Sequence, residues 1–192
     1  MKIGTFSAGQ DLVTERSESL PILDFPVDPT QFSHKRDQEL EAARPDTAIP
    51  HVVAWNITRR CNLECSHCYI SAGSWQSAEN ELSTEDCHRV LDDVLAVNPA
   101  VLLILSGGEP LVRDDLEEIA DHAASAGATV VVGTNGTGLS DERIKSLKGA
   151  GVRGVAVSID SLNPDYHDRF RHGSGSLSAT LDAVTRLGEH GL

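Results

Sequence analysis

The chain has 192 residues and a formal net charge of −13, from 29 acidic and 16 basic residues. Such a surface repels nucleic acid backbones and anionic membranes, so neither is an expected partner, and solubility explains the acidity better than an acidic binding function. No apolar run approaches the roughly 20 residues of a membrane span, and the start lacks the apolar core of a signal peptide. We therefore expect a cytoplasmic protein whose cysteines stay reduced and available to metal.

The first part of the chain differs from the rest in composition and periodicity. Residues 1–50 are polar, with scattered prolines and no sustained periodicity, so we expect a loosely ordered extension with one short helix at 33–44. At 52–58, β-branched and aromatic residues predict a strand that leads directly into a group of cysteines. We expect residues 51–192 to form the core domain.

Apolar periodicity beyond the cysteines predicts alternating helices and strands. The expected elements are a helix at 83–97, a strand at 101–105, a helix at 116–126, a strand at 128–132, a helix at 140–148, a strand at 155–159 and a helix at 177–187. The strands are continuously apolar, as in strands covered on both faces. Four βα units predict an α/β fold with a parallel sheet, either a small open sheet or half of a barrel. Because the chain stops where a new strand would begin, we expect a fragment.

Each predicted strand ends in residues suited to a ligand, which parallel βα folds bind at the carboxyl ends of their strands. These ends are the cysteine loop, then Ser106–Pro110, Gly133–Thr137 and Ser158–Ser161. Gly107 and Gly108 would let backbone approach a ligand closely, and Glu109 offers a carboxylate there. Taken alone, an ordinary βα turn explains this Gly-Gly-Glu run equally well.

Cys61, Cys65 and Cys68 form a C-x3-C-x2-C run. Three soft ligands with no fourth close by suit a cubane iron–sulfur cluster that keeps one iron open for an external ligand. A structural zinc ion would need a closed set of four ligands, with His67 or Cys87 as the fourth.

A buried helix face is the non-metal alternative for these thiols, because their spacing fits one side of a helix and cysteine is a common core residue. The polar residues between them argue against it. Arg59 and Arg60 precede the run, and we expect them to lower the thiol pKa values. Cys87 lies on the apolar face of the helix at 83–97 and is expected to be core.

The conjunction of motifs resembles the radical S-adenosylmethionine (SAM) superfamily. The motifs that carry this resemblance, in chain order over residues 51–192, are Cys61-x3-Cys65-x-His67-Cys68, Gly107-Gly108-Glu109-Pro110, Thr134-Asn135-Gly136 and Ser158-Ile159-Asp160. The resemblance implies a partial, TIM-like (β/α)6 barrel of which this chain supplies about four units. It also implies a [4Fe-4S] cluster on Cys61, Cys65 and Cys68, with SAM on the open iron.

Further roles follow from the resemblance by position. The implied SAM-binding residues are His67 against the adenine, Gly107 and Gly108 through backbone, Glu109 on the methionyl amino group, Asn135 at the pocket floor, Ser158 and Asp160 facing ribose and carboxylate, and Arg171 on the carboxylate. An arginine fork suits bidentate carboxylate binding, whereas Asp160 could equally be a capping residue. The implied reaction is reductive cleavage of SAM to a 5′-deoxyadenosyl radical that abstracts hydrogen from a substrate, with electrons from ferredoxin or flavodoxin.

The amino-acid sequences of three segments resemble those of the branch that carries a C-terminal SPASM domain. These segments are Trp55–Cys61, His67–Tyr69 and His167–Arg171. Within that branch, the resemblance is nearest to enzymes of heme d1 and siroheme-dependent heme biosynthesis, which implies a tetrapyrrole substrate. The alternatives are a peptide-modifying maturase, a non-catalytic iron–sulfur or zinc module, and a cluster-free structural protein. SPASM proteins hold auxiliary clusters on further cysteines, and this chain has none after Cys87, so we expect weak cluster binding and poor turnover.

Overall fold

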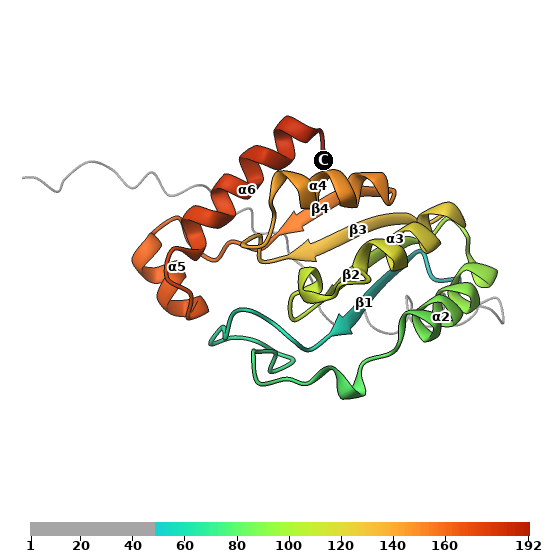
Figure 1. The fold of residues 1–192 in the computed structure, drawn as a ribbon, viewed down its shortest axis with the longest axis horizontal. Helices are drawn as coiled ribbons and strands as arrows, with labels where there is room; N and C mark the ends of the chain where they lie inside the picture. Colours follow the sequence, from blue (N-terminus) through green and yellow to red (C-terminus); the bar gives the residue numbers. More distant parts are fainter. Residues whose placement is uncertain (1–48) are drawn as a thin grey trace, which may run out of the picture. The chain divides into compact units, whose positions relative to one another are not determined.

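The computed structural model describes residues 49–192. The extension expected at 1–50, apart from its last two residues, and the helix expected at 33–44 lie outside this range. The described residues contain a four-stranded parallel sheet, in spatial order β1-β2-β3-β4 (Figure 1). Its strands are β1 (Val52–Thr58), β2 (Leu102–Gly107), β3 (Thr129–Thr134) and β4 (Val152–Val157).

Helices connect successive strands. The helices of this part of the chain are α2 (Thr84–Val97), α3 (Leu116–Ser125), α4 (Asp141–Gly149), α5 (Pro164–Arg171) and α6 (Ser176–His190), with 3-10 turns η1 (Ala78–Asn80) and η2 (Pro110–Val112). The hydroxyls of Ser83 and Ser140 accept backbone N–H groups at the starts of α2 and α4, as N-caps do. The expected α/β fold with a parallel sheet is confirmed.

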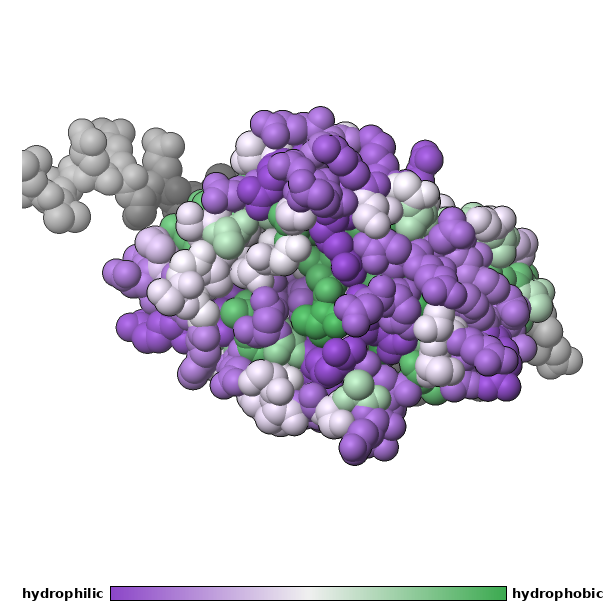
Figure 2. Space-filling view, viewed as in Figure 1, coloured by the Kyte–Doolittle hydropathy of each residue, from purple (hydrophilic) through white to green (hydrophobic). Residues whose placement is uncertain are grey.

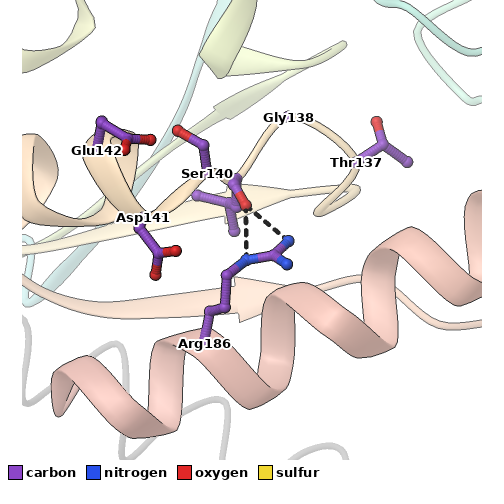
Figure 3. A pocket seen from close by; sticks show the side chains of 7 residues that line it. Thr137, Gly138, Ser140, Asp141, Glu142 and Arg186 are labelled. Atoms are coloured by element: carbon purple, nitrogen blue, oxygen red, sulfur yellow. Dashed lines mark hydrogen bonds between the residues drawn. The ribbon is translucent and has the colours of Figure 1, made fainter.

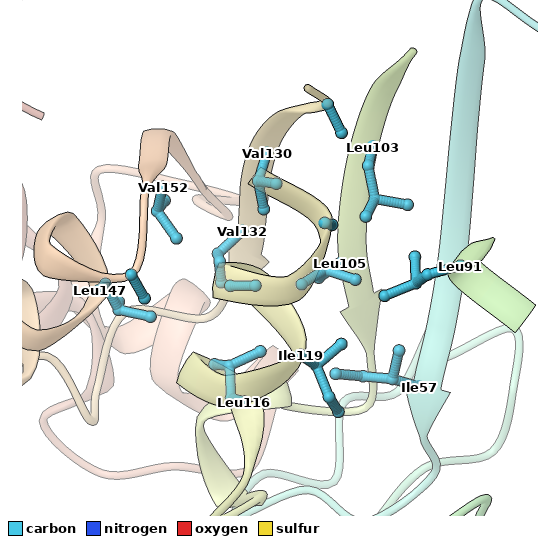
Figure 4. Packing of buried hydrophobic residues seen from close by; sticks show 14 of the residues in the cluster. Ile57, Leu91, Leu103, Leu105, Leu116, Ile119, Val130, Val132, Leu147 and Val152 are labelled. Atoms are coloured by element: carbon cyan, nitrogen blue, oxygen red, sulfur yellow. The ribbon is translucent and has the colours of Figure 1, made fainter. Parts of the chain in front are cut away.

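The hydrophobic core lies between the sheet and the apolar sides of α2, α3, α4 and α6. In Figure 4, Leu103 and Leu105 of β2 and Val132 of β3 point toward Ile119 of α3. Burial alternates along β2, where Leu103 and Leu105 are buried but Leu102 and Ile104 only partly so. The expectation of strands covered on both faces is therefore wrong: helices cover one face, and Ile104 on the other lines a cavity.

Two elements differ from the sequence prediction. The fourth strand ends at Val157, so Ser158 and Ile159 belong to the loop beyond it, where Ser158 N–H still donates to Thr134 O over 3.0 Å. Helix α5 was not predicted at all. Its buried side chains are His167 and Arg171, and a search for apolar periodicity passes over a helix whose buried face is polar.

Hydrophilic residues cover most of the face seen in Figure 2, as the composition predicts. Between residues 49 and 192, no helix has both the length and the hydrophobicity that crossing a membrane requires.

Candidate functional site

A cavity of about 390 Å³ lies at the carboxyl ends of the strands. Most of the residues singled out from the sequence line it, namely Cys61, Cys65, His67, Cys68, Gly107, Gly108, Asn135, Ser158 and Arg171. Glu109 and Asp160 are absent from its lining. The structure thus brings together residues from all four strand ends, as the topology of a parallel sheet predicts.

The three loop thiols are each partly buried and free of disulfides. The backbone N–H of Leu63 donates to Cys61 Sγ over 3.4 Å, and that of Ala72 donates to Cys68 Sγ over 3.3 Å. Among the described residues, no three His, Cys, Asp or Glu side chains are close enough to hold a single metal ion. Thiols spaced along a cavity wall, with N–H donors to two sulfurs, fit a multi-iron cluster with cysteine ligands.

The cysteine loop is anchored on the end of α5. Glu64 N–H donates to Arg171 O over 3.4 Å, and Ser66 N–H donates to Phe170 O over 2.9 Å. The last carbonyls of a helix have no partner within it, so here the loop supplies their hydrogen bonds. The unpredicted helix α5 therefore shapes the segment that carries Cys65.

Burial raises the pKa values of Cys61 and Cys65 above the ordinary thiol range. The positive charge of Arg171 partly offsets this for Cys65. The expected influence of Arg59 and Arg60 is wrong. Arg59 Nη2 donates to Ile70 O over 2.8 Å, and Arg60 is engaged by a carboxylate outside the loop, Glu81 Oε2, at 3.0 Å.

The glycine pair after β2 allows a close approach between two parts of the chain itself. A methyl group on Gly107 would overlap Thr58 O, and one on Gly108 would overlap Arg60 O. Gly107 also has a φ of +139°, which L side chains rarely adopt. Gly108 N–H and Glu109 N–H donate to those same two carbonyls, each over 2.9 Å. The glycines therefore place the start of the cysteine loop directly beside the end of β2.

Glu109 is 1% exposed and joins two strand ends. Its carboxylate accepts from Thr134 Oγ1 at 2.7 Å, Asn135 N at 2.8 Å and Leu111 N at 3.1 Å. Burial raises its pKa, and these donors offset part of that rise. The sequence had not indicated Thr134 as a partner. Contact of Glu109 with a methionyl amino group stays a prediction.

His67 and Arg171, which line the cavity, both contact Asp160, which does not line it. Asp160 Oδ2 lies 2.6 Å from Arg171 Nε, and its other oxygen lies 3.7 Å from His67 Nε2. The His67 ring stacks on Phe170, with centroids 4.7 Å apart. The backbone N–H of Asp160 lies 3.4 Å from Nδ1 of the buried His167, so α5 also orients this carboxylate.

A second, shallower hollow of about 370 Å³ lies beside the start of α4 (Figure 3). Two of its charged side chains already have partners. Arg186 donates to Leu139 O from Nε over 3.2 Å and from Nη2 over 2.9 Å, and Asp141 Oδ1 lies 2.8 Å from His190 Nε2. Of the strand-end residues that the sequence predicted for a ligand site, only Thr137 lines it.

Comparison with protein families gives a match to the radical SAM superfamily over residues 55–192. An AdoMet-dependent heme synthase from Methanosarcina barkeri is 42% identical over 141 residues, which cover 73% of this chain and 40% of that protein. A pre-heme d1 synthase from Dinoroseobacter shibae is 36% identical over 166 residues, covering 84% of this chain and 40% of that protein. The chain thus spans about two fifths of the length of these curated relatives.

Among solved structures, Streptococcus suis SuiB bound to S-adenosylmethionine superimposes with a TM-score of 0.64. The match covers 81% of this chain and 36% of that chain at 15% sequence identity. At this identity the likeness concerns the fold, and it matches the four-stranded sheet to part of a larger barrel.

Proposed function

The chain belongs to the radical SAM superfamily, and from this premise we propose that Cys61, Cys65 and Cys68 hold a [4Fe-4S] cluster next to a SAM site. The observation that carries the proposal is the single cavity shared by these thiols, the Gly107-Gly108 turn and Arg171. When bound, the cluster would supply one electron to the sulfonium of SAM, and cleavage of a carbon–sulfur bond would release methionine and the 5′-deoxyadenosyl radical that takes hydrogen from a substrate.

The protein's own part is positioning. Arg171 lines the cavity with a fixed positive charge suited to the carboxylate of SAM, and Asn135 and Ser158 offer polar groups on the same wall. His67 presents a ring, stacked on Phe170, against which an adenine can lie. Glu109 and Asp160 do not line the cavity, but each contacts a residue that does. Asp160 pairs with Arg171, and Glu109 accepts from the Asn135 backbone N–H, so both carboxylates are included in the proposed SAM site.

For the substrate class we propose a tetrapyrrole whose side chains are modified. The support is the identity to the heme synthase, 42% over 141 residues, and to the pre-heme d1 synthase, 36% over 166 residues. A low-potential donor such as ferredoxin or flavodoxin would supply the electron. A peptide is the alternative substrate class. We also propose that residues 1–50 form an extension and that residues 51–192 form part of the barrel.

The test is anaerobic reconstitution with iron and sulfide, followed by dithionite and SAM. The expected result is a brown protein whose electron paramagnetic resonance spectrum changes on addition of SAM and which forms 5′-deoxyadenosine. Product formation with a tetrapyrrole carrying carboxylate side chains, and none with a peptide, supports the substrate class. A colourless protein, or a spectrum indifferent to SAM, would contradict the proposal.

Two cysteine variants form a matched pair for this test. Cys65→Ala removes a thiol that lines the cavity, and it should abolish cluster and product together. Cys87→Ala removes a 0% exposed thiol on the core-facing side of α2, and it should spare both. Loss of the cluster in Cys87→Ala alone would mean that the ligands are misassigned.

A further inference from the structure

Three side chains at the carboxyl end of the sheet form a closed ring of hydrogen bonds. Asn62 Nδ2 donates to Thr137 Oγ1 over 2.8 Å, and Thr137 Oγ1 donates to Asn135 Oδ1 over 2.7 Å. Asn135 Nδ2 completes the ring by donating to Asn62 Oδ1 over 2.8 Å. Each side chain donates once and accepts once in the ring, so the three bonds polarise in the same direction and strengthen one another.

This Asn62–Thr137–Asn135 ring joins two distant segments of the chain. Asn62 follows the first cysteine of the loop, whereas Asn135 and Thr137 follow β3, and 73 positions separate Asn62 from Asn135. The ring is therefore a direct side-chain link between the cysteine loop and the end of β3. The later part of the loop is held by α5, so the two anchors act on different cysteines.

The backbone determines which way the Asn135 carboxamide faces. Thr137 N–H donates to Asn135 Oδ1 over 2.9 Å, so that atom must be the oxygen. Nδ2 then faces Asn62 and lies 4.0 Å from Cys61 Sγ. Asn135 is 7% exposed and has little access to water, so a broken ring would leave its carboxamide short of partners.

The Thr137 side chain is turned toward this ring and not toward Arg186. In Figure 3 its side chain points away from Arg186, which is turned to the backbone carbonyl of Leu139. The hydroxyl instead accepts a hydrogen bond from Asn62 of the cysteine loop.

We propose that Asn62 and Thr137 are positioning residues for the first cluster ligand, Cys61. They hold the Asn135 carboxamide with its N–H toward the sulfur and fix the cysteine loop against β3. The inference rests on the proposed function, because it concerns the same cluster. Donors near a ligating sulfur raise the reduction potential of a cluster, and groups that orient ligands typically contribute about 10–100-fold to metal retention.

The decisive variant is Thr137→Val, which removes the hydroxyl at nearly constant volume. In the reconstituted 192-residue chain we expect iron loss to a chelator to be about tenfold faster than in the wild type. We also expect the reduction potential to shift downward, because the Asn135 oxygen then keeps only the Thr137 backbone N–H as a donor and its N–H is held less firmly near Cys61. Thr137→Ser restores the hydroxyl and should return both quantities toward the wild-type values.

Two further variants separate positioning from folding. Asn62→Ala breaks the ring at an exposed residue, and it should reproduce both effects with an unchanged circular dichroism spectrum. Asn98→Ala is the matched control: Asn98 also makes two hydrogen bonds, to Pro50 O and from Ala100 N, but outside the cysteine loop. It should leave iron loss and potential unchanged.

The outcomes distinguish this inference from the function on which it rests. If the wild type binds a cluster and Thr137→Val and Asn62→Ala match its iron loss and potential, the positioning role is overturned and the proposed function stands. If the wild type takes up no cluster, the proposed function fails and the positioning role fails with it.

Discussion

Arg171, which lines the cavity, forms an ion pair with Asp160, with Nε and Oδ2 2.6 Å apart. Both charges act on Cys65. The guanidinium lowers the pKa of this thiol and the carboxylate raises it, while burial, the largest influence, raises it overall. One pair thus provides both the positive charge of the cavity and the electrostatic environment of a proposed cluster ligand.

Replacing Arg171 and replacing Asp160 should change the reactivity of Cys65 in opposite directions. Arg171→Gln removes the positive charge, raises the thiol pKa further and slows alkylation by iodoacetamide at mildly alkaline pH, since the thiolate is the nucleophile. Asp160→Asn removes the negative charge and should accelerate alkylation. The measurement is peptide mapping by mass spectrometry on the metal-free chain. Changes of the same sign in both variants would show that loosening of the loop, and not charge, controls the thiol.

The glycine turn after β2 gives a second prediction. Gly107→Ala places a methyl group against Thr58 O at a φ of +139°, and the strained backbone alone should cost about 1–3 kcal/mol. Gly188→Ala is the control, because a methyl group there meets nothing and α6 favours alanine by about 1 kcal/mol. Urea denaturation should therefore show a less stable Gly107 variant and a more stable Gly188 variant. Equal stability of Gly107→Ala and the wild type would contradict the close approach of the two loops.

The fold was largely predictable because the apolar periodicity that indicates each helix and strand lies within that segment of the sequence. Runs such as Val101–Leu105 and the apolar side of Thr84–Val97 contain their periodicity in the sequence itself, and alternation of such segments predicts a parallel sheet. Helix α5 was missed because its buried residues, His167 and Arg171, are polar. These two side chains contact Asp160, and the end of α5 contacts the cysteine loop. Such contacts leave no apolar periodicity in the sequence.

For the candidate site, the sequence indicated most of the residues that line the cavity, but it did not indicate the partners that each residue contacts. The cysteine spacing and strand-end loops identify residues that do line one cavity. Whether Glu109 faces that cavity or the β3 loop depends on donors from Thr134 and Asn135, which no local pattern reveals. The same holds for the glycines, whose close neighbours are the carbonyls of Thr58 and Arg60.

A buried arginine beside the site gives a third prediction. Arg113 is 4% exposed, pairs with Asp115 at 2.6 Å, and donates to Ile57 O and Leu82 O, each over 3.1 Å. Arg113→Met would remove the donor to the Ile57 and Leu82 carbonyls and leave Asp115 with the Thr84 hydroxyl, and it should reduce the free energy of unfolding by about 3 kcal/mol.

The control for this arginine is Arg89→Met. Arg89 pairs with Asp86 on the exposed side of α2, and its loss should change stability by less than about 0.5 kcal/mol. Both values follow from urea denaturation curves recorded at the same pH. A cost for Arg113→Met no larger than that for Arg89→Met would mean that the buried network adds nothing to stability.

Asp168 caps α6 from the preceding helix, and this makes its contribution to stability dependent on pH. Its carboxylate accepts from Leu177 N and Ser176 Oγ, each over 2.9 Å, and from Gly175 N. These hydrogen bonds, that from Leu177 N–H first, lower the pKa of Asp168 below its ordinary value. A carboxyl group with a lowered pKa stabilises the folded state above its unfolded pKa of about 3.9, and this contribution is lost as the pH falls through the folded value.

Asp168→Ala should therefore lower the melting temperature at neutral pH, and the gap to the wild type should close on acidification below about pH 4. Asp182→Ala, an exposed aspartate on α6 itself, should show no such gap at neutral pH. The measurement is a series of thermal melts followed by circular dichroism across this pH range. Because α6 packs Ala183 and Leu187 into the core, a lost cap reaches the sheet through those side chains. A gap between wild type and Asp168→Ala that stays constant into acid would mean that the Asp168 carboxylate acts through shape alone, without its charge.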